Sequence, residues 1–386
     1  MNIGIFTDSY LPETNGVAVS TKMLKDELNN LGHNAYIITT ANPQRTTVEG
    51  GVYSLPSVPF AFIPERRLGT IYSNKVRRII KKLDLDIVHT HTEFSIGLFG
   101  KINALALHIP VVHTYHTIYK EYGHYFKLGR FKKLTSGMAK TVTKSYCSGC
   151  KALIVPTKKT FDLLCEYGLE NDKYIIPTGI DLSKFGEESI DKAEVKRLRK
   201  SYYINDNEKV LLFLGRVAKE KSIDVIIRAF PEILKMTPGI KLVIVGGGAA
   251  LKGLLEMCVE FGVSENVVFT GEAPWSKIAD YYRLGDIFIS ASTSETQGLT
   301  YIEAIASGLP VIAMRDECLE GIIEDKVSGL VFEDESMLPE LINMIVNDDE
   351  LRASICENAL LSVQKYRSEN YAKSVLEVYE AVLQKT

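Results

Sequence analysis

Residues Ser290–Ala313 read SASTSETQGLTYIEAIASGLPVIA, and this stretch decides the fold. It continues the apolar run Ile287–Ile289, which is typical of a buried strand, and small polar residues mark that strand's carboxyl end. Gly298 then opens a helical pattern with apolar residues on one face, and the apolar run Pro310–Ala313 predicts the next strand. Ligands of α/β sheets normally bind at the carboxyl ends of the strands. Backbone amides at the glycine turn and the helix dipole favour an anion there, most simply a phosphate.

Two carboxylates bracket the glycine turn. Glu295 precedes the turn, and Glu303 lies just over one helical turn inside the predicted helix. An ionised glutamate only accepts hydrogen bonds, and the hydroxyls of ribose and hexose supply matching donors. A lone glutamate would be an ordinary solvated helix residue. The pair, the glycine turn and both apolar runs occur together, which favours a binding site.

The segment ETQGLTYIE, followed by AIASGLPVIA, resembles the E-x7-E signature of the family 4 retaining glycosyltransferases. The resemblance implies an α/β protein with the GT-B fold, in which two Rossmann-like, doubly wound parallel-sheet domains face an inter-domain crevice. It also implies a nucleotide-sugar donor as co-substrate, no further cofactor and no required metal. Glu303 would bind the ribose hydroxyls, Glu295 the donor hexose, and the amides of Gly298, Leu299 and Thr300 the diphosphate and sugar.

Length and composition agree with a two-domain globular protein. The chain has 386 residues, of which 46% are hydrophobic and 24% charged, enough for two separate cores. With the resemblance, we expect an N-terminal acceptor-binding and membrane-facing domain (1–184), a C-terminal nucleotide-sugar domain (185–369) and a C-terminal helix crossing back to the first domain (370–386). No run approaches the roughly 18 apolar residues of a membrane span, and no signal-peptide pattern opens the chain. We therefore expect a cytoplasmic protein, peripheral on the inner face of the cell membrane.

Charge is shared unevenly along the chain. Residues 1–185 carry 23 Lys and Arg against 15 Asp and Glu, a net charge of +8, whereas the remainder has a net charge of −11. Such asymmetry indicates an anionic surface that meets the first domain. Because no nucleic-acid-binding motif accompanies the positive charge, we do not expect nucleic acid as a partner.

Two basic stretches supply this positive charge. Glu65–Lys82 and Lys120–Lys144 each carry seven cations against one acid, and the second interleaves them with aromatic and apolar residues at helical spacing. Aromatic rings in the headgroup layer and cations near anionic lipid favour a membrane interface, while a solvated charged face is the open alternative. The residues expected on the membrane and acceptor side are Tyr125, Phe126, Lys127, Arg130, Lys132 and Lys133.

Alternating strands and helices in the first half predict βαβ units and a parallel sheet. The expected strands are Ile3–Phe6, Ala35–Thr40, Asp86–His89 and Ile109–His113. After the first strand, Asn15-Gly16 leads into a predicted helix, and a glycine there lets the backbone approach a phosphate, although an ordinary turn is the simpler explanation. In the family a glycine pair at this point contacts the donor diphosphate. By resemblance Gly16 contacts the donor, and Asn15 departs from the pattern.

Several potential metal ligands fall at strand ends in this half: His89, His91, Glu93, His113 and His116. Adjacent strand residues alternate faces, so only part of this set can converge on one ion. The family gives another interpretation, because Thr114-x-His116 resembles its T-x-H element, whose histidine lies beside the sugar and the reaction centre. His89 is also explained as a structural histidine. We expect no metal site.

The second half contains a pair of cations after a predicted strand. Val210–Leu214 runs into Gly215-Arg216, and Lys221 follows five residues later. A guanidinium and an ammonium on one loop neutralise a diphosphate well. The G-R-x4-K pattern resembles the family's pyrophosphate clamp, with Ser222 in place of the usual glycine.

Two further strands are expected after the clamp. The run Val243–Gly248 ends in three glycines but is not a dinucleotide fingerprint, because Leu251 stands where a further glycine is required. Val267–Gly271 is the next strand, and family members hold the base with the loop that follows it.

The six cysteines include the lone C-x-x-C pair Cys147 and Cys150. Without a second pair this does not favour a zinc or redox site, so we expect reduced thiols.

The resemblance implies transfer of a hexose, glucose from UDP-glucose, with retention of configuration. Residues expected at the reaction centre are His116, Glu295, Arg216 and Lys221. Since both glutamates of the second half are assigned to the donor, same-face attack assisted by the leaving diphosphate is favoured. The opening IGIFTDSYLPETNGVAVSTKML and the basic aromatic stretch are most similar to bacterial 1,2-diacylglycerol 3-glucosyltransferases, which implies a lipid acceptor. A soluble sugar or polysaccharide-precursor acceptor, a non-transferring sugar-nucleotide-binding protein and an epimerase are the alternatives.

Overall fold

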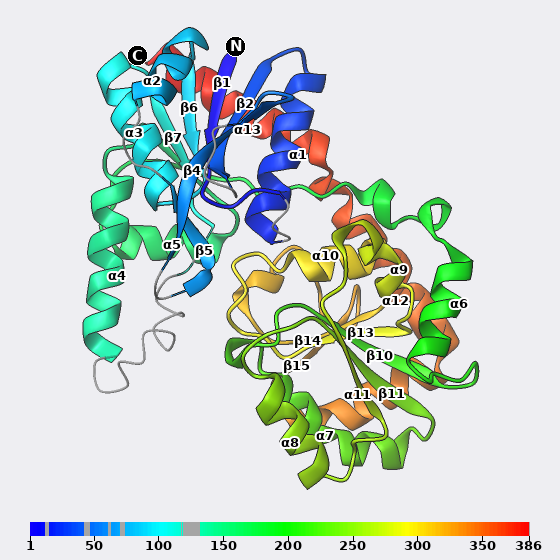
Figure 1. Ribbon diagram of the computed structural model, residues 1–386. Coiled ribbons are helices and arrows are strands. Elements are labelled where there is room, and N and C mark those ends of the chain that lie inside the picture. The colour runs from blue at the N-terminus through cyan, green and yellow to red at the C-terminus, as the bar shows by residue number, and fades with distance from the viewer. Residues whose placement is uncertain are drawn as a thin grey trace. The chain divides into compact units, whose positions relative to one another are not determined.

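Two compact units make up the chain (Figure 1). The computed structural model describes residues 1–11, 15–41, 47–60, 63–69, 74–116, 118 and 132–385. Unit 1 comprises Met1–Gly179 together with Ser368–Thr386, and unit 2 comprises Ile180–Arg367. These boundaries lie within a few residues of the expected 184/185 and 369/370.

Unit 1 is built on a nine-stranded sheet with the order β3-β4-β2-β1-β6-β7-β8-β9, and β5 pairs with β4 beside this path. Its strands are β1 (Asn2–Phe6), β2 (Asn34–Ala41), β3 (Thr47–Glu49), β4 (Val52–Phe60), β5 (Ile63–Gly69), β6 (Ile87–Thr90), β7 (Val111–Thr114), β8 (Ala152–Val155) and β9 (Asp172–Ile175). Strands β3 and β5 run antiparallel to β4, and the other pairs are parallel. The four predicted strands of this unit are confirmed.

Helices cover both faces of this sheet (Figure 1). They are α1 (Gly16–Asn30), α2 (Asn74–Lys82), α3 (Ser95–Leu107), α4 (Lys132–Cys147), α5 (Lys158–Glu166) and α13 (Ser368–Gln384). On one face α1 and α13 pack together, and Leu24, Leu28, Val375 and Tyr379 join the strands in one apolar cluster. On the other face α2 to α5 contribute to a second cluster.

Unit 2 is a six-stranded sheet with the order β12-β11-β10-β13-β14-β15, and all of its strand pairs are parallel. Its strands are β10 (Lys209–Leu214), β11 (Ile240–Val245), β12 (Val267–Gly271), β13 (Ile287–Ser290), β14 (Val311–Met314) and β15 (Leu330–Phe332). Its helices are α6 (Lys192–Ser201), α7 (Ile223–Met236), α8 (Leu251–Glu260), α9 (Ile278–Tyr282), α10 (Leu299–Ala306), α11 (Leu338–Asn347) and α12 (Asp349–Val363). Helices α7, α8 and α11 bury one face of the sheet, and α6, α9, α10 and α12 bury the other.

The predicted fold of two doubly wound, mainly parallel sheets is confirmed. The segment from β3 to β5 was not predicted, because Pro56 and Pro59 interrupt its pattern and the charges of Glu65–Lys82 pointed to a basic surface. That basic stretch is divided between β5 and α2. Within the described part of the chain, no helix is long and apolar enough to cross a bilayer.

Candidate active site

The carboxyl edge of the unit 2 sheet brings three loops together. The amide of Val217, in the loop after β10, donates to the Gly247 carbonyl (2.8 Å) in the loop after β11, and the Ala250 amide donates back to the Val217 carbonyl (3.0 Å). The Ser294 hydroxyl, in the loop after β13, donates to the Glu220 carbonyl (3.0 Å). The loop with the predicted clamp cations is therefore held from both sides.

The three glycines after β11 make this contact between loops sterically feasible. A Cβ on Gly246 would lie 1.9 Å from the Gly215 carbonyl oxygen, and a Cβ on Gly248 would lie 2.2 Å from the Val217 carbonyl oxygen. Both glycines also adopt positive φ, 143° and 152°, which side chains disfavour. The glycine run does not form a dinucleotide fingerprint. It lets the loop that carries Arg216 and Lys221 pack directly against the backbone that follows β11.

Lys221 and Glu295, predicted separately for diphosphate and hexose, form an ion pair. The Nζ of Lys221 lies 2.5 Å from Oε1 of Glu295, and each side chain is only 17% exposed. A pair this sheltered from water interacts more strongly than a surface pair. The structure thus places a cation and a carboxylate next to each other where the donor is expected.

Arg216 is held by a residue that the sequence did not single out. Its guanidinium lies 2.8 Å from Oε1 of Glu220, whose side chain is 7% exposed while that of Arg216 is 43% exposed. Glu220 therefore anchors one side of the guanidinium. Its spacing of four residues from Arg216 on a loop is not a recognisable signal.

The glycine turn before α10 has the geometry expected of an anion-binding helix start. Gly298 has φ 72° and ψ 50°, and no side chain caps the helix. A Cβ on Gly298 would meet the Tyr301 ring at 2.4 Å, so only glycine fits. The amides of Leu299 and Thr300 lie in the first turn of α10, where backbone N–H groups lack intrahelical partners.

Glu303 is a buried carboxyl on α10. The Tyr282 hydroxyl, from α9, donates to its Oε2 (2.6 Å). Burial raises the pKa of Glu303 to about 7, although the hydrogen bond from Tyr282 and the nearby Lys184 both act to lower it. Burial also raises the pKa of Tyr282 well above 10, so the tyrosine stays a donor. The sequence did not predict Tyr282 as a partner of this carboxyl.

The loop after β12, expected to hold the base, contains the single tryptophan of the sequence, Trp275. The Nζ of Lys184 lies 4.0 Å from the centroid of the Trp275 ring and donates to the Trp275 carbonyl (3.2 Å). The cation and ring form a cation–π contact. This contact fixes the loop near Glu303, whose pKa responds to the Lys184 charge.

In unit 1, the departure at Asn15 has a structural explanation. The Asn15 side chain accepts from the Ala18 amide (3.1 Å) and caps α1, and its Nδ2 donates to the Ser9 hydroxyl (2.6 Å). Asparagine is among the best helix N-caps. The residue therefore secures the start of α1, where Gly16 is the first helical residue.

Two of the four histidines at the strand ends, His91 and His116, form a hydrogen-bonded pair. His91 Nδ1 lies 2.9 Å from His116 Nε2, and the two rings stack with centroids 5.1 Å apart. Burial, with a smaller contribution from His113, lowers the pKa of His116 to about 3, so His116 is neutral at physiological pH. His91 Nε2 is buried and has no hydrogen-bond partner among the described residues.

The remaining potential metal ligands are engaged elsewhere. His89 lies 2.6 Å from the Tyr379 hydroxyl and 2.7 Å from the Thr114 hydroxyl, and His113 Nε2 lies 3.3 Å from Glu93 Oε1. In the part of the chain that the structure describes, no group of three or more His, Cys, Asp or Glu residues could hold a metal ion. His89 is a structural histidine that ties β6 to α13.

Most of the predicted membrane residues lie outside the part of the chain that the structure describes. Tyr125, Phe126, Lys127 and Arg130 lie outside the described residues, and Lys132 and Lys133 begin helix α4. The cysteines are free thiols as predicted, and Cys147 and Cys150 are buried. Burial raises the pKa of Cys150 to about 11, which makes it a poor nucleophile and a poor metal ligand.

Solved structures with the same architecture identify the fold. A crystal structure of the Anabaena protein HepE in complex with UDP-glucose is 16% identical, with a TM-score of 0.76 over 98% of this chain and 99% of that chain. Sucrose-phosphate synthase from Thermosynechococcus elongatus is 18% identical, with a TM-score of 0.76 over 100% and 99% of the two chains. These likenesses show that the two parallel α/β units have the GT-B fold.

Family models and relatives then give the family. The model described as "Glycosyl transferases group 1" matches residues 194–362, and that described as "Glycosyltransferase Family 4" matches residues 14–184. An "Alpha-monoglucosyldiacylglycerol synthase" of Streptococcus pneumoniae is 39% identical over 98% of this chain and 85% of the relative. A protein of the same name from Acholeplasma laidlawii is 35% identical over 100% and 98% of the two chains. The chain belongs to the family 4 glycosyltransferases, as its motifs predicted.

Proposed function

We propose that this enzyme transfers glucose from UDP-glucose, with retention, to the free hydroxyl of 1,2-diacylglycerol at a membrane surface, without a metal ion. The observation that carries the proposal is the similarity to two enzymes named for this product, at 39% and 35% identity over nearly the whole chain. The geometry of unit 2 supports the donor side of this proposal, and the surface of unit 1 supports a lipid acceptor.

We propose that the donor diphosphate replaces the carboxylates as the partner of the two clamp cations. Lys221 is paired with Glu295, and Arg216 with Glu220. A diphosphate that draws Lys221 toward itself frees Glu295 to accept hydrogen bonds from hexose hydroxyls. As the glycosidic bond breaks, negative charge grows on the leaving diphosphate, and the two cations stabilise that charge.

The nucleoside side of the donor is assigned to Glu303 and its neighbours. An ionised Glu303 can accept from two ribose hydroxyls while Tyr282 continues to donate to its Oε2. The amides of Gly298, Leu299 and Thr300 would contact the diphosphate at the start of α10. In this scheme ionisation of Glu303, with its pKa of about 7, accompanies donor binding.

Retention follows from the chemistry of the proposed substrate and product. Glucose in UDP-glucose is alpha-linked, and the two relatives are named for an alpha-linked product. Since Glu295 and Glu303 are assigned to the donor, we propose that the acceptor hydroxyl attacks from the face that the diphosphate leaves. His116, neutral and fixed by His91, would orient the sugar or the incoming hydroxyl through a hydrogen bond.

The surface of unit 1 offers an apolar face for lipid. Four exposed side chains at helical spacing follow one side of α3, and we call them the α3 stripe: Phe94, Leu98, Ile102 and Leu105. Their spacing of three and four residues puts them on one face of the helix. Leu105 is 80% exposed, and a contiguous row of exposed apolar side chains marks a surface that meets a partner or a membrane.

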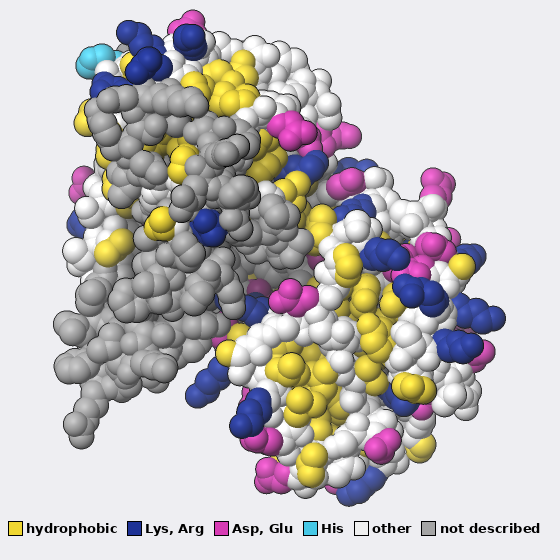
Figure 2. All heavy atoms as spheres, viewed as in Figure 1, with side chains coloured by type: hydrophobic (Ala, Val, Ile, Leu, Met, Phe, Trp, Pro, Cys, Tyr) yellow, Lys and Arg dark blue, Asp and Glu magenta, His cyan; other side chains and the backbone are white. Residues whose placement is uncertain are grey.

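Cations accompany this apolar face. Helix α2 packs against α3 and carries four exposed cations, the α2 cations: Arg77, Arg78, Lys81 and Lys82. Figure 2 shows Lys and Arg side chains gathered at the end of unit 1 where α2 lies in Figure 1. Apolar side chains that enter the headgroup layer and cations that meet anionic lipid are the two components of interfacial binding.

A donor and acceptor panel tests the proposal. The purified enzyme is incubated with labelled UDP-glucose, UDP-galactose or GDP-mannose, and with diacylglycerol in mixed micelles or a soluble sugar, each with and without EDTA. We expect UDP-glucose and diacylglycerol to give a glucolipid, from which an alpha-glucosidase releases glucose. EDTA should not change the activity. Transfer to the soluble sugar alone would contradict the lipid acceptor, and loss of activity in EDTA that Mn²⁺ or Mg²⁺ restores would contradict metal independence.

A further inference from the structure

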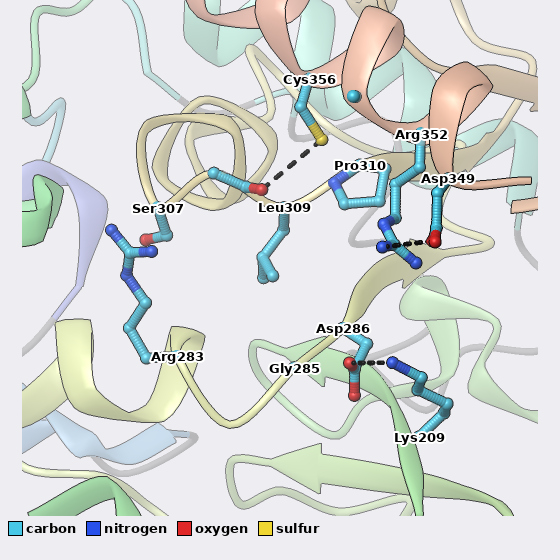
Figure 3. Close-up of a pocket in the computed structure, with 12 residues that line it drawn as sticks. Lys209, Arg283, Gly285, Asp286, Ser307, Leu309, Pro310, Asp349, Arg352 and Cys356 are labelled. Carbon is cyan, nitrogen blue, oxygen red and sulfur yellow. Dashed lines mark hydrogen bonds and ion pairs between the residues drawn. The ribbon is translucent and has the colours of Figure 1, made fainter. Parts of the chain in front are cut away.

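A pocket lies at the opposite edge of the unit 2 sheet from the clamp loops. Its volume is about 360 Å³, room for roughly ten water molecules at about 30 Å³ each. Lys209 begins β10, Asp286 directly precedes β13, and Ser307 follows the end of α10. Arg352 and Cys356 reach the pocket from α12 (Figure 3). The pocket therefore lies at the amino ends of the strands, away from the donor site.

Two buried polar atoms of this pocket lack hydrogen-bond partners. Arg283 Nε and Ser307 Oγ are both buried, and neither has a partner among the described residues. Ser307 is only 1% exposed, and in Figure 3 Ser307 and Arg283 are both drawn among the residues that line the pocket. One terminal nitrogen of Arg283 donates to the Phe185 carbonyl (3.1 Å). Buried donors are nearly always satisfied, so these two indicate a missing acceptor.

The charged residues that line the pocket provide no ion-pair partner for Arg283, and the Glu187 carboxylate acts on its pKa only from beyond ion-pair distance. Lys209 pairs with Asp286 at 3.2 Å, and Arg352 pairs with Asp349 at 2.7 Å, so these four charges cancel. Arg283 makes no ion pair within the described part of the chain. Burial lowers its pKa, but a guanidinium remains charged at any physiological pH. The pocket therefore carries one net positive charge, half-buried.

We propose that this pocket binds a compact oxyanion of the phosphate type, either free or as a small phosphate ester. Arg283 Nε and the Ser307 hydroxyl are buried, so both side chains would turn toward the anion to donate to its oxygens, and the guanidinium would supply the counter-charge. Lys209 and Arg352 lie on the surrounding wall and can turn toward the same anion. The site is separate from the proposed donor site and does not depend on the proposed reaction.

Cys356 provides a reporter within the pocket. Its thiol donates to the Gly308 carbonyl (3.5 Å), and its side chain is partly exposed, whereas Cys165 on α5 of unit 1 is exposed. The test measures alkylation of each thiol by N-ethylmaleimide at mildly alkaline pH, resolved by peptide mass spectrometry, at constant ionic strength with chloride, inorganic phosphate or glycerol phosphate. We expect inorganic phosphate to slow alkylation of Cys356 at least threefold and to leave Cys165 unchanged. Greater protection by glycerol phosphate would identify an ester as the ligand, and protection by inorganic phosphate alone a free anion.

Three variants locate the anion. Arg283→Gln should abolish the protection, and Ser307→Ala, which removes a hydroxyl without a partner, should weaken it in a protein that folds normally. Lys221→Ala, in the donor site, should retain it. Equal alkylation of Cys356 in phosphate and chloride would overturn the proposal. So would protection that survives Ser307→Ala unchanged but disappears in Lys221→Ala, since the phosphate would then bind the clamp.

Discussion

Replacing Glu303 by Gln should stabilise unit 2 at alkaline pH and weaken donor binding at the same time. The isosteric amide keeps an oxygen that can accept from Tyr282, so the packing and the hydrogen bond of 2.6 Å are preserved. The variant removes only the ionisation of a buried carboxyl. In the wild-type enzyme, ionisation of Glu303 lowers the folding stability when no donor is bound. The same ionisation provides a charged hydrogen-bond acceptor when the donor is bound.

The size of the effect follows from the raised pKa. Glu303 titrates near 7 in the folded protein and near its ordinary value of 4.5 in the unfolded chain. Between these pH values the folded state holds a proton that the unfolded state has lost, so wild-type stability falls as pH rises. Each pKa unit corresponds to about 1.4 kcal/mol, so the loss is about 3 kcal/mol and is complete above pH 7. Gln does not titrate, so the stability of Glu303→Gln relative to wild type should increase by this amount as the pH rises from 4.5 to above 7.

Urea unfolding followed by Trp275 fluorescence measures this difference, because the single tryptophan lies in unit 2. With a urea m value of about 3 kcal/mol/M, the midpoint of Glu303→Gln should exceed that of wild type by about 1 M more at pH 8 than at pH 4.5. Glu256→Gln on α8, whose side chain is 70% exposed, is the matched control and should show no pH-dependent difference. A Glu303→Gln advantage that is the same at both pH values would refute the reasoning. The donor KM of Glu303→Gln should rise, while that of wild type should fall as pH increases through about 7.

Three further predictions concern the clamp cations, the glycines after β11 and the membrane surface. Arg216→Ala and Lys221→Ala should each lower kcat at least tenfold, because each removes a contact that strengthens as the diphosphate leaves; near-normal kcat/KM in both variants would show that the clamp is misassigned. Gly246→Ala should destabilise unit 2 by several kcal/mol, since its Cβ would lie 1.9 Å from the Gly215 carbonyl, whereas Gly253→Ala in α8, with open space around it, should change stability by at most about 1 kcal/mol; thermal unfolding of both variants measures this. In vesicle co-sedimentation, neutralising the α2 cations should reduce binding to anionic lipid at low salt by about 1 kcal/mol per charge, and replacing the α3 stripe by serine should reduce binding with little salt dependence; binding that ignores lipid charge in wild type would contradict this docking surface.

The sequence predicted the repeating architecture well because its signals are local. Apolar runs such as Val210–Leu214 and Ile287–Ile289 are buried strands, and buried parallel strands are continuous apolar segments. The β4 strand was missed because proline at 56 and 59 breaks the pattern that a strand normally shows. The family motifs pointed to Arg216, Lys221 and both glutamates as candidate site residues for the same reason, since each motif is a short contiguous segment.

Partnerships between distant segments could not be predicted. Glu303 meets Tyr282 from another helix, and Lys221 meets Glu295, 74 residues later in the chain. The raised pKa of Glu303 depends on burial, which a single sequence does not display. The three glycines after β11 were visible, but their contact with the Gly215–Val217 backbone requires knowing that two loops meet at one edge of the sheet.

The position of α13 in unit 1 has a consequence for biosynthesis. Unit 2 is a continuous stretch, so it can fold as soon as it leaves the ribosome, whereas unit 1 needs Ser368–Gln384, which are translated after all of unit 2. Until then the strand residues that pack on Val375 and Tyr379 have no cover, and His89 lacks the hydroxyl 2.6 Å from its Nδ1. The half of the enzyme that is synthesised first should therefore mature last, and the nascent chain should need protection from aggregation during that interval.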